Sequence, residues 1–170
     1  SSSNTDVWDL LKITDEDPSN SSNVILLYTG RTQAKSQNSG ERSASGSNRW
    51  NREHVWSKSH GFPSESDTAY TDVHHIRPAD ESVNSSRGTK DFDNGGSAHS
   101  EAVDCNYDSD SWEPRDAVKG DVARMMFYME VRYDPGVHTD GTTYDLELVD
   151  YTGTSTSSTN FGKLSTLITW

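Results

Sequence analysis

The chain has 170 residues and a mass of 18.9 kDa, the size of a single domain. Its residues are 30% hydrophobic and include no apolar run long enough for a membrane-spanning helix, so we expect a soluble chain with no membrane partner. The net charge of −12 argues against attraction of nucleic acid by the molecule as a whole. Residues 31–60 nevertheless carry six basic and two acidic side chains. We interpret this basic segment as a solvated loop, with a local anion site as the alternative.

The N-terminal part is predicted to contain a helix, a strand and a long loop. Apolar residues at helical spacing over 7–11 indicate the helix, and the apolar run over 24–28 indicates a buried strand. Residues 29–49 are rich in Thr, Gln, Ser, Gly and Arg, which is typical of a loop.

The middle of the chain is predicted to fold in the order strand, strand, helix. Residues 51–56 and 71–76 are the strand candidates, with a turn region between them at 61–63. A short helix is expected over 82–87, because Asp80 or Ser82 can cap its start and Gly88 can end it.

The last third of the chain is predicted to be dominated by one long helix over 114–133, with Pro114 in its first turn. Alternating apolar residues over 144–148 and an apolar stretch over 164–170 follow it. Cys105 is the single cysteine, so the chain can form no internal disulfide and no cysteine-rich zinc site. These elements together predict a mixed α+β fold in one domain. The apolar face of the long helix is formed by Val118, Val122, Met125, Met126 and Met129.

Chemistry-bearing residues are densest between positions 51 and 87. Imidazole, with an unperturbed pKa near ~6.5, can deprotonate a water, which suits His54 for the role of general base. A carboxylate and an amide oxygen, here Glu53 and Asn84, are ligands that a hard cation prefers. A guanidinium matches the oxygens of a phosphate, and the candidates for this clamp are Arg77, Arg87 and Arg124.

These candidate residues lie in four segments whose sequences are more specific together than any single residue. The segments are Asn51-Arg52-Glu53-His54-Val55-Trp56, Thr71 to Pro78, Ser82 to Arg87, and Lys119 to Arg124. In residue types and order they resemble the endonuclease I family of bacterial secreted and periplasmic nucleases, which are ββα-metal (His-Me finger) enzymes. The resemblance implies a finger over about residues 50–88, with His54 as general base and Glu53 and Asn84 on one Mg²⁺. It also implies nonspecific cleavage of DNA, and often RNA, to 5′-phosphate and 3′-hydroxyl ends.

The resemblance implies further properties and leaves alternatives open. Mn²⁺ or Ca²⁺ can stand in for Mg²⁺, and a monomer is expected. Related chains continue past the position of Trp170, so this domain is expected to lack a C-terminal segment. A catalytically silent nucleic-acid or surface-binding module on the same scaffold is the alternative function. The acidic residues between 91 and 110 leave an additional structural Ca²⁺ site open, although their spacing does not fit an EF-hand.

One geometric requirement follows from the adjacency of Glu53 and His54. Neighbouring residues on a regular strand point to opposite faces, so both can serve one site only if the strand ends, twists or bulges there. We predict such an irregularity.

Overall fold

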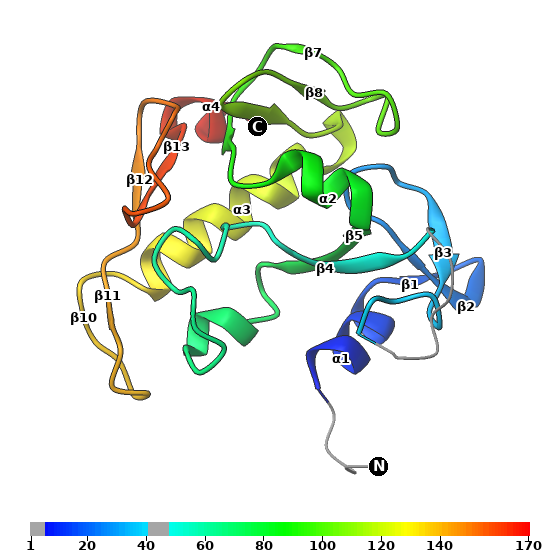
Figure 1. The fold of residues 1–170 in the computed structure, drawn as a ribbon, viewed down its shortest axis with the longest axis horizontal. Helices are drawn as coiled ribbons and strands as arrows, with labels where there is room; N and C mark the ends of the chain where they lie inside the picture. The colour runs from blue at the N-terminus through cyan, green and yellow to red at the C-terminus, as the bar shows by residue number, and fades with distance from the viewer. Residues whose placement is uncertain (1–5, 41–47) are drawn as a thin grey trace.

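A helix and a small sheet form the N-terminal side of the molecule (Figure 1). The computed structural model describes residues 6–40 and 48–170. Helix α1 (Val7–Thr14) begins where the side chain of Asp6 accepts a hydrogen bond from the backbone N of Asp9 at 3.1 Å. Strands β1 (Glu16–Asp17), β2 (Asn20–Ile25) and β3 (Thr32–Ala34) form an antiparallel sheet in that order. The helix predicted over 7–11 is confirmed.

The predicted strand over 24–28 is displaced. Strand β2 ends at Ile25, and the apolar residues after it are buried in a turn in which the backbone N of Leu27 donates to the carbonyl of Pro78 at 2.9 Å. Apolarity here marks contact with the core rather than strand pairing. The predicted loop over 29–49 contains β3, and its residues 41–47 lie outside the described part of the chain.

A strand–strand–helix unit occupies residues 50–87. Strands β4 (Trp50–His54) and β5 (Ile76–Asp80) pair antiparallel, and α2 (Glu81–Arg87) follows β5 directly and contacts both strands. Gly88 ends the helix with φ +57°, a conformation that favours glycine. The predicted order of elements and the predicted helix over 82–87 are confirmed.

The predicted strand over 71–76 is wrong. A 3₁₀ turn, η1 (Thr68–Thr71), occupies its beginning, and pairing starts only at Ile76. Asp72 accounts for the difference, because its carboxylate accepts hydrogen bonds from the backbone N of His74 and from the hydroxyl of Tyr133, which turns the chain. Pro78 is tolerated inside β5 because this two-stranded sheet leaves it on an edge strand.

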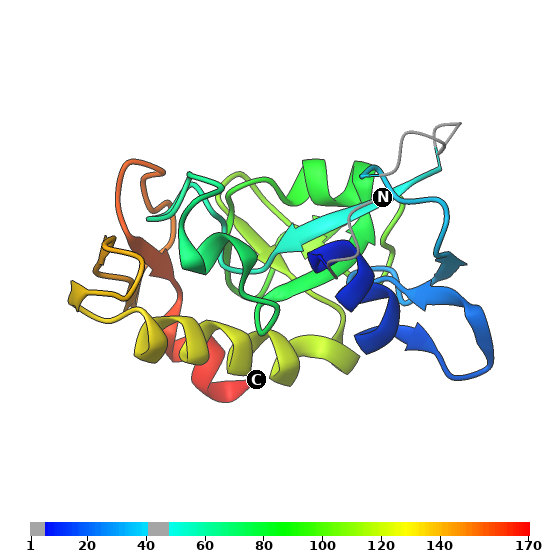
Figure 2. The ribbon, with the colours of Figure 1, turned by 90° about the horizontal axis from the view of Figure 1, so that it is seen from below.

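Helix α3 (Asp116–Arg132) lies on the opposite side of the β4–β5 pair from α2 (Figure 2). Its buried face supplies much of the core and is the face predicted from the sequence, so the long helix is confirmed. The buried residues of α3 are Val118, Val122, Ala123, Met125, Met126 and Met129.

Small sheets complete the fold. Strands β6 (Asp91–Phe92), β7 (Ser97–Ala98), β8 (Asn106–Tyr107) and β9 (Ser111–Glu113) form a four-stranded sheet that the sequence did not predict. Strands β10 (Gly136–Val137) and β11 (Thr143–Tyr144) pair antiparallel, β12 (Glu147–Val149) pairs parallel with β13 (Asn160–Gly162), and α4 (Leu164–Thr169) follows. The predicted mixed α+β fold is confirmed. Within residues 6–40 and 48–170, no helix has the length and apolarity needed to cross a membrane.

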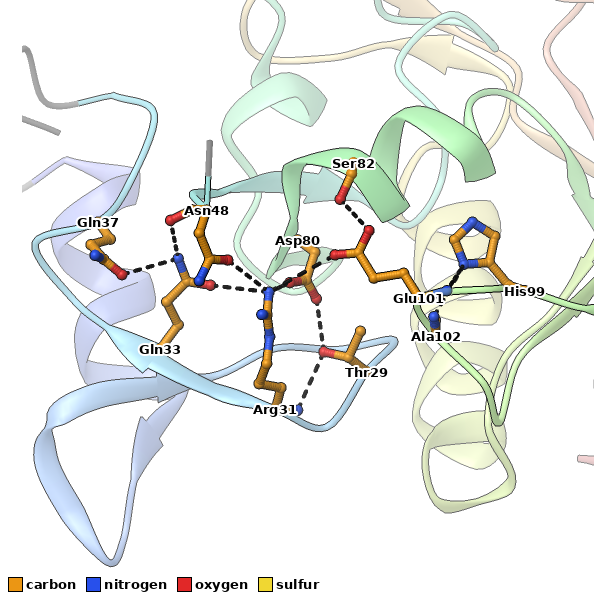
Figure 3. A network of polar contacts seen from close by, with 10 residues as sticks. All are labelled: Thr29, Arg31, Gln33, Gln37, Asn48, Asp80, Ser82, His99, Glu101 and Ala102. Carbon is orange, nitrogen blue, oxygen red and sulfur yellow. Dashed lines mark hydrogen bonds and ion pairs between the residues drawn. The ribbon is translucent and has the colours of Figure 1, made fainter. Parts of the chain in front are cut away.

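A polar network fixes the start of α2 to the N-terminal sheet (Figure 3). Arg31 forms an ion pair with the buried carboxylate of Asp80, which also accepts a hydrogen bond from the hydroxyl of Thr29 at 2.7 Å. On the first turn of α2, Ser82 donates to Glu101 at 2.6 Å. This network holds in place the helix that carries Asn84.

Candidate active site

Several of the predicted site residues line one cavity of about 440 Å³ between β4, α2 and the chain that follows β4. Glu53 and His54 come from the end of β4, whereas Asn84 and Arg87 come from α2. The structure therefore brings together the predicted base, the two predicted metal ligands and one of the three candidate arginines. The cavity is also lined by Trp8, Ser39, Asn51, Arg52, Ser57, Lys58, Ser59, Tyr70, Gly88 and Thr89.

The end of strand β4 accounts for the use of two adjacent residues. Pairing stays in register through both, with Glu53 opposite Arg77 and His54 opposite Ile76, so β4 has no bulge at this point. The strand ends at His54. The predicted irregularity could be a strand end, a twist or a bulge, and the structure shows a strand end. Glu53 and His54 both line the cavity.

His54 is held as a neutral imidazole with a defined tautomer. Its Nε2 lies 2.9 Å from the carbonyl oxygen of Tyr70, and because a carbonyl only accepts, Nε2 carries the proton. Nδ1 therefore keeps its lone pair. Burial, followed by the neighbouring His75, lowers the pKa of His54 to about 3, so the ring is unprotonated at neutral pH. This is the protonation state that a general base needs.

The carboxylate of Glu53 is buried and is contacted on one oxygen. The hydroxyl of Tyr28 donates to Oε1 at 2.6 Å, and Nη1 of Arg87 lies 3.4 Å from the same atom. Burial raises the pKa of Glu53, while Arg87 and the Tyr28 hydrogen bond oppose that shift. Because both contacts fall on Oε1, Oε2 remains to accept a cation, and a cation would offset the cost of burying this charge.

Asn84 presents its amide oxygen in the same cavity. Its Nδ2 donates to Oδ1 of Asn51 at 2.7 Å and to the carbonyl of Arg52 at 3.3 Å, which leaves the Oδ1 of Asn84 to accept. One carboxylate and one amide oxygen, completed by waters, fit the preference of Mg²⁺ for oxygen ligands and retained waters. Oxygen donors of this kind suit a hard cation. Over the described ranges, no group of three or more His, Cys, Asp and Glu side chains is placed to hold a metal.

The three candidate arginines lie in three different environments. Arg87 lies beneath the cavity, donating to the carbonyls of His54 and Val55 at 3.3 and 2.6 Å, and it is 1% exposed. Arg77 donates to backbone carbonyls, pairs with Asp15 at 3.7 Å and does not line the cavity. Arg124 lies on α3 in an exposed pair with Asp121, at a different cavity. Arg77 and Arg124 therefore do not line the cavity of Glu53 and His54, although Arg77 is the cross-strand neighbour of Glu53.

The acidic segment that left a Ca²⁺ site open uses its carboxylate groups within the fold. Oδ1 of Asp108 accepts hydrogen bonds from the backbone N and the hydroxyl of Ser111 at 2.8 and 2.9 Å, and Asp110 accepts from the hydroxyl of Thr152 at 3.0 Å. Cys105, in the same segment, is a buried free thiol that donates to the carbonyl of Tyr28. Burial raises the pKa of this thiol to about 11, so it stays protonated at neutral pH.

Sequence reasoning missed two tyrosines that support the site. Tyr28 holds the carboxylate of Glu53, and the carbonyl of Tyr70 sets the tautomer of His54. Tyr28 was recognisable only as the last residue of an apolar run, and Tyr70 lies in an unpatterned segment. Both act across separations of 25 and 16 residues, which no local pattern reports.

Removing the hydroxyl of Tyr28 is expected to weaken metal binding. Tyr28→Phe leaves the ring in place but frees Oε1 of Glu53, and loss of such a supporting hydrogen bond typically costs about 10–100-fold in metal affinity. Calorimetric titration with Mg²⁺ measures the change. Tyr144→Phe is the matched control, because that buried hydroxyl donates to Asp140 elsewhere. Equal affinities for the two variants would contradict the assigned role.

The buried histidines are expected to make the fold sensitive to acid. Burial lowers the pKa of His54 to about 3 and that of His75 to about 4, whereas both take up a proton near pH 6.5 in the unfolded chain. The unfolded state therefore binds more protons below about pH 6.5, and the free energy of unfolding falls by about 1.4 kcal/mol per pH unit for each histidine. Urea unfolding between about pH 7 and about pH 5 measures this slope. His75→Gln should make the slope shallower, and an unchanged slope would exclude His75 as a source.

The cavity combines a buried carboxylate, an amide oxygen and a neutral imidazole, which are the groups expected of a site that uses a hard cation and a general base. The family model described as Endonuclease I matches residues 1–170, and the chain belongs to this family. The chain is 57% identical over 164 residues to an extracellular ribonuclease of Bacillus amyloliquefaciens, covering 96% of this chain and 53% of the relative. It is 54% identical over 166 residues to an extracellular ribonuclease of Bacillus subtilis (strain 168), covering 98% and 54%. The chain therefore spans about half the length of these relatives.

Proposed function

We propose that the chain is the catalytic part of a secreted, metal-dependent endonuclease that hydrolyses the phosphodiester bonds of RNA and DNA with little sequence preference. Membership of the Endonuclease I family supports phosphodiester hydrolysis and a metal requirement. The two relatives named extracellular ribonucleases support RNA as a substrate and secretion. In this proposal β4, β5 and α2 are the ββα-metal finger.

The observation that carries the proposal is the shared cavity of Glu53, His54 and Asn84. Each of these side chains has one polar atom engaged by the protein and another left to react or to bind: Oε2 of Glu53, Nδ1 of His54 and Oδ1 of Asn84. A module that only bound nucleic acid would have no use for a neutral imidazole held in one tautomer beside a buried carboxylate.

Different residues of the chain have different roles in the hydrolysis. Nδ1 of His54 accepts the proton of a water as its oxygen attacks the phosphorus, and the anionic phosphate in the cavity raises the pKa of His54 because it favours the protonated ring. Arg87 holds Glu53 and the backbone of His54 in place from below. When bound by Glu53 and Asn84, Mg²⁺ supplies positive charge that stabilises the developing charge on the phosphate and on the leaving 3′ oxygen.

A water nucleophile predicts both the substrates and the products. The attack uses no 2′-hydroxyl, so DNA and RNA are both expected to be cut, leaving 5′-phosphate and 3′-hydroxyl ends. The experiment incubates the chain with supercoiled plasmid and with single-stranded RNA, in Mg²⁺ or in chelator, and identifies the ends. Cleavage of RNA alone to 2′,3′-cyclic phosphates would overturn the proposal. A folded chain that binds RNA but cuts neither substrate would instead support a silent binding module.

A further inference from the structure

The distribution of ion pairs sets two basic residues apart, and the inference drawn from them rests on the proposed function. Although the chain carries a net charge of −12, within residues 6–40 and 48–170 Arg52 and Lys58 form no ion pair, and both line the cavity. Most other described cations are paired with carboxylates, including three from the basic segment 31–60. The pairs are Lys12–Asp9, Arg31–Asp80, Lys35–Glu16, Arg49–Glu81, Arg77–Asp15, Arg87–Glu53, Lys119–Glu113, Arg124–Asp121 and Lys163–Asp93.

Arg52 is held over aromatic rings rather than by an anion. Its guanidinium carbon lies 4.9 Å from the ring centre of Trp8 and 5.8 Å from that of Tyr70, and the residue is half-buried. Such contacts stabilise a cation without using its N–H donors. Because the guanidinium donates to no other described residue, its planar set of donors remains available to an anion in the cavity.

Lys58 reaches the same tyrosine from the segment after β4. Its Nζ lies 3.2 Å from the hydroxyl oxygen of Tyr70 and 4.9 Å from the ring centre. The ring of Tyr70 lies 4.8 Å from the ring of His54, and its carbonyl is the acceptor that fixes the histidine tautomer. The ring of Tyr70 therefore contacts both cations and the imidazole of His54.

No described carboxylate supplies a negative charge within ion-pair distance of Arg52 or Lys58, although both line the cavity. An anion that entered the cavity would therefore meet two cations without an acidic partner. The Glu53 carboxylate is turned towards Tyr28 and Arg87, so it does not provide this charge.

We propose that Arg52 and Lys58 form a binding subsite for a backbone phosphate next to the scissile one, carried by Tyr70 and Trp8. The substrate class is then an oligonucleotide or polynucleotide of either sugar, because a small diester with a single phosphate fills the reactive position and leaves the subsite empty. Contacts with backbone phosphates position a nucleic-acid strand and carry no base specificity.

The experiment compares Arg52→Gln, Lys58→Gln and the double variant with the wild type. Direct binding of a labelled single-stranded RNA is followed by fluorescence anisotropy in chelator at several salt concentrations. Cleavage in Mg²⁺ is measured for the same RNA and for a nitrophenyl phosphodiester carrying one phosphate. The matched control is the double variant Lys35→Gln with Arg132→Gln, which removes two charges away from the cavity.

Arg52→Gln is expected to raise the Kd and KM for RNA about tenfold, as for loss of a charge-assisted phosphate contact. Each single variant should reduce the slope of log K against log salt by about 0.7, the single-strand value, and the double variant by about twice as much. The loss of kcat/KM for the double variant should be at least about tenfold greater for RNA than for the small diester.

Two results would overturn the subsite. Equal losses on both substrates would mean that the cations act through His54, and an unchanged Kd and salt slope would mean that they contact no phosphate. Failure of the nuclease proposal is separate from either, because a wild type that cuts nothing can still show the anisotropy change and its loss in the variants. That result would refute hydrolysis and retain the phosphate subsite.

Discussion

Replacing His54 with alanine is expected to lower kcat on plasmid and on RNA by about 10²–10⁴-fold, the usual contribution of a general base. The substitution removes Nδ1, the atom that keeps a lone pair because Nε2 donates to the carbonyl of Tyr70. Substrate binding depends on other side chains, so KM should change little. Steady-state cleavage assays with saturating Mg²⁺ give both constants.

A second histidine controls for the loss of an imidazole in the same region. His74 is exposed, contacts Asp72 and does not line the cavity. His74→Ala should keep kcat within about threefold of the wild type, as is usual for an exposed side chain outside the chemistry. If His54→Ala kept more than a tenth of the wild-type kcat, another group would have to be the base.

Local patterns were enough to predict α1, α2 and α3, but the apolar stretch over 164–170, which folds into α4, was not assigned as a helix. Spacing of apolar residues located α1 and α3, and Gly88 marked the end of α2 because the left-handed conformation there favours glycine. The residue types and order of the four segments between 51 and 124 were also sufficient to recognise the family that the comparison then confirmed.

Strand positions depended on contacts that local patterns do not carry. Residues 71–76 have strand composition, yet hydrogen bonds from the distant Tyr128 and Tyr133 to Asp72 favour a turn there. The run that ends at Tyr28 is apolar because it packs into the core, not because it pairs along its length.

The sequence could not rank the candidate cations for a related reason. Every arginine in the segment 31–60 has the same chemistry in the sequence, and what distinguishes Arg52 is the absence of a carboxylate partner among the described residues. Arg77 lies in one of the recognised segments, but its guanidinium is used by backbone carbonyls and by Asp15. Which cation is available to substrate depends on where the acidic residues fold.

Glu53→Gln is expected to remove metal binding and to destabilise the fold. The amide lacks the charge that attracts a divalent cation, so Mg²⁺ affinity should fall by more than about 100-fold, beyond the loss typical of a supporting residue. The variant also leaves Arg87 buried without a counter-charge, since the two side chains are 2% and 1% exposed. Breaking such a pair costs about 3–5 kcal/mol, which urea unfolding would detect.

The two effects can be separated by removing both partners of the pair. In the double variant Glu53→Gln with Arg87→Met, no uncompensated charge remains in the core, so most of the lost stability should return. Metal affinity should not return, because it depends on the carboxylate itself. Recovery of both stability and Mg²⁺ affinity would show that Glu53 stabilises the fold without binding the metal, whereas recovery of stability alone assigns the carboxylate to the cation.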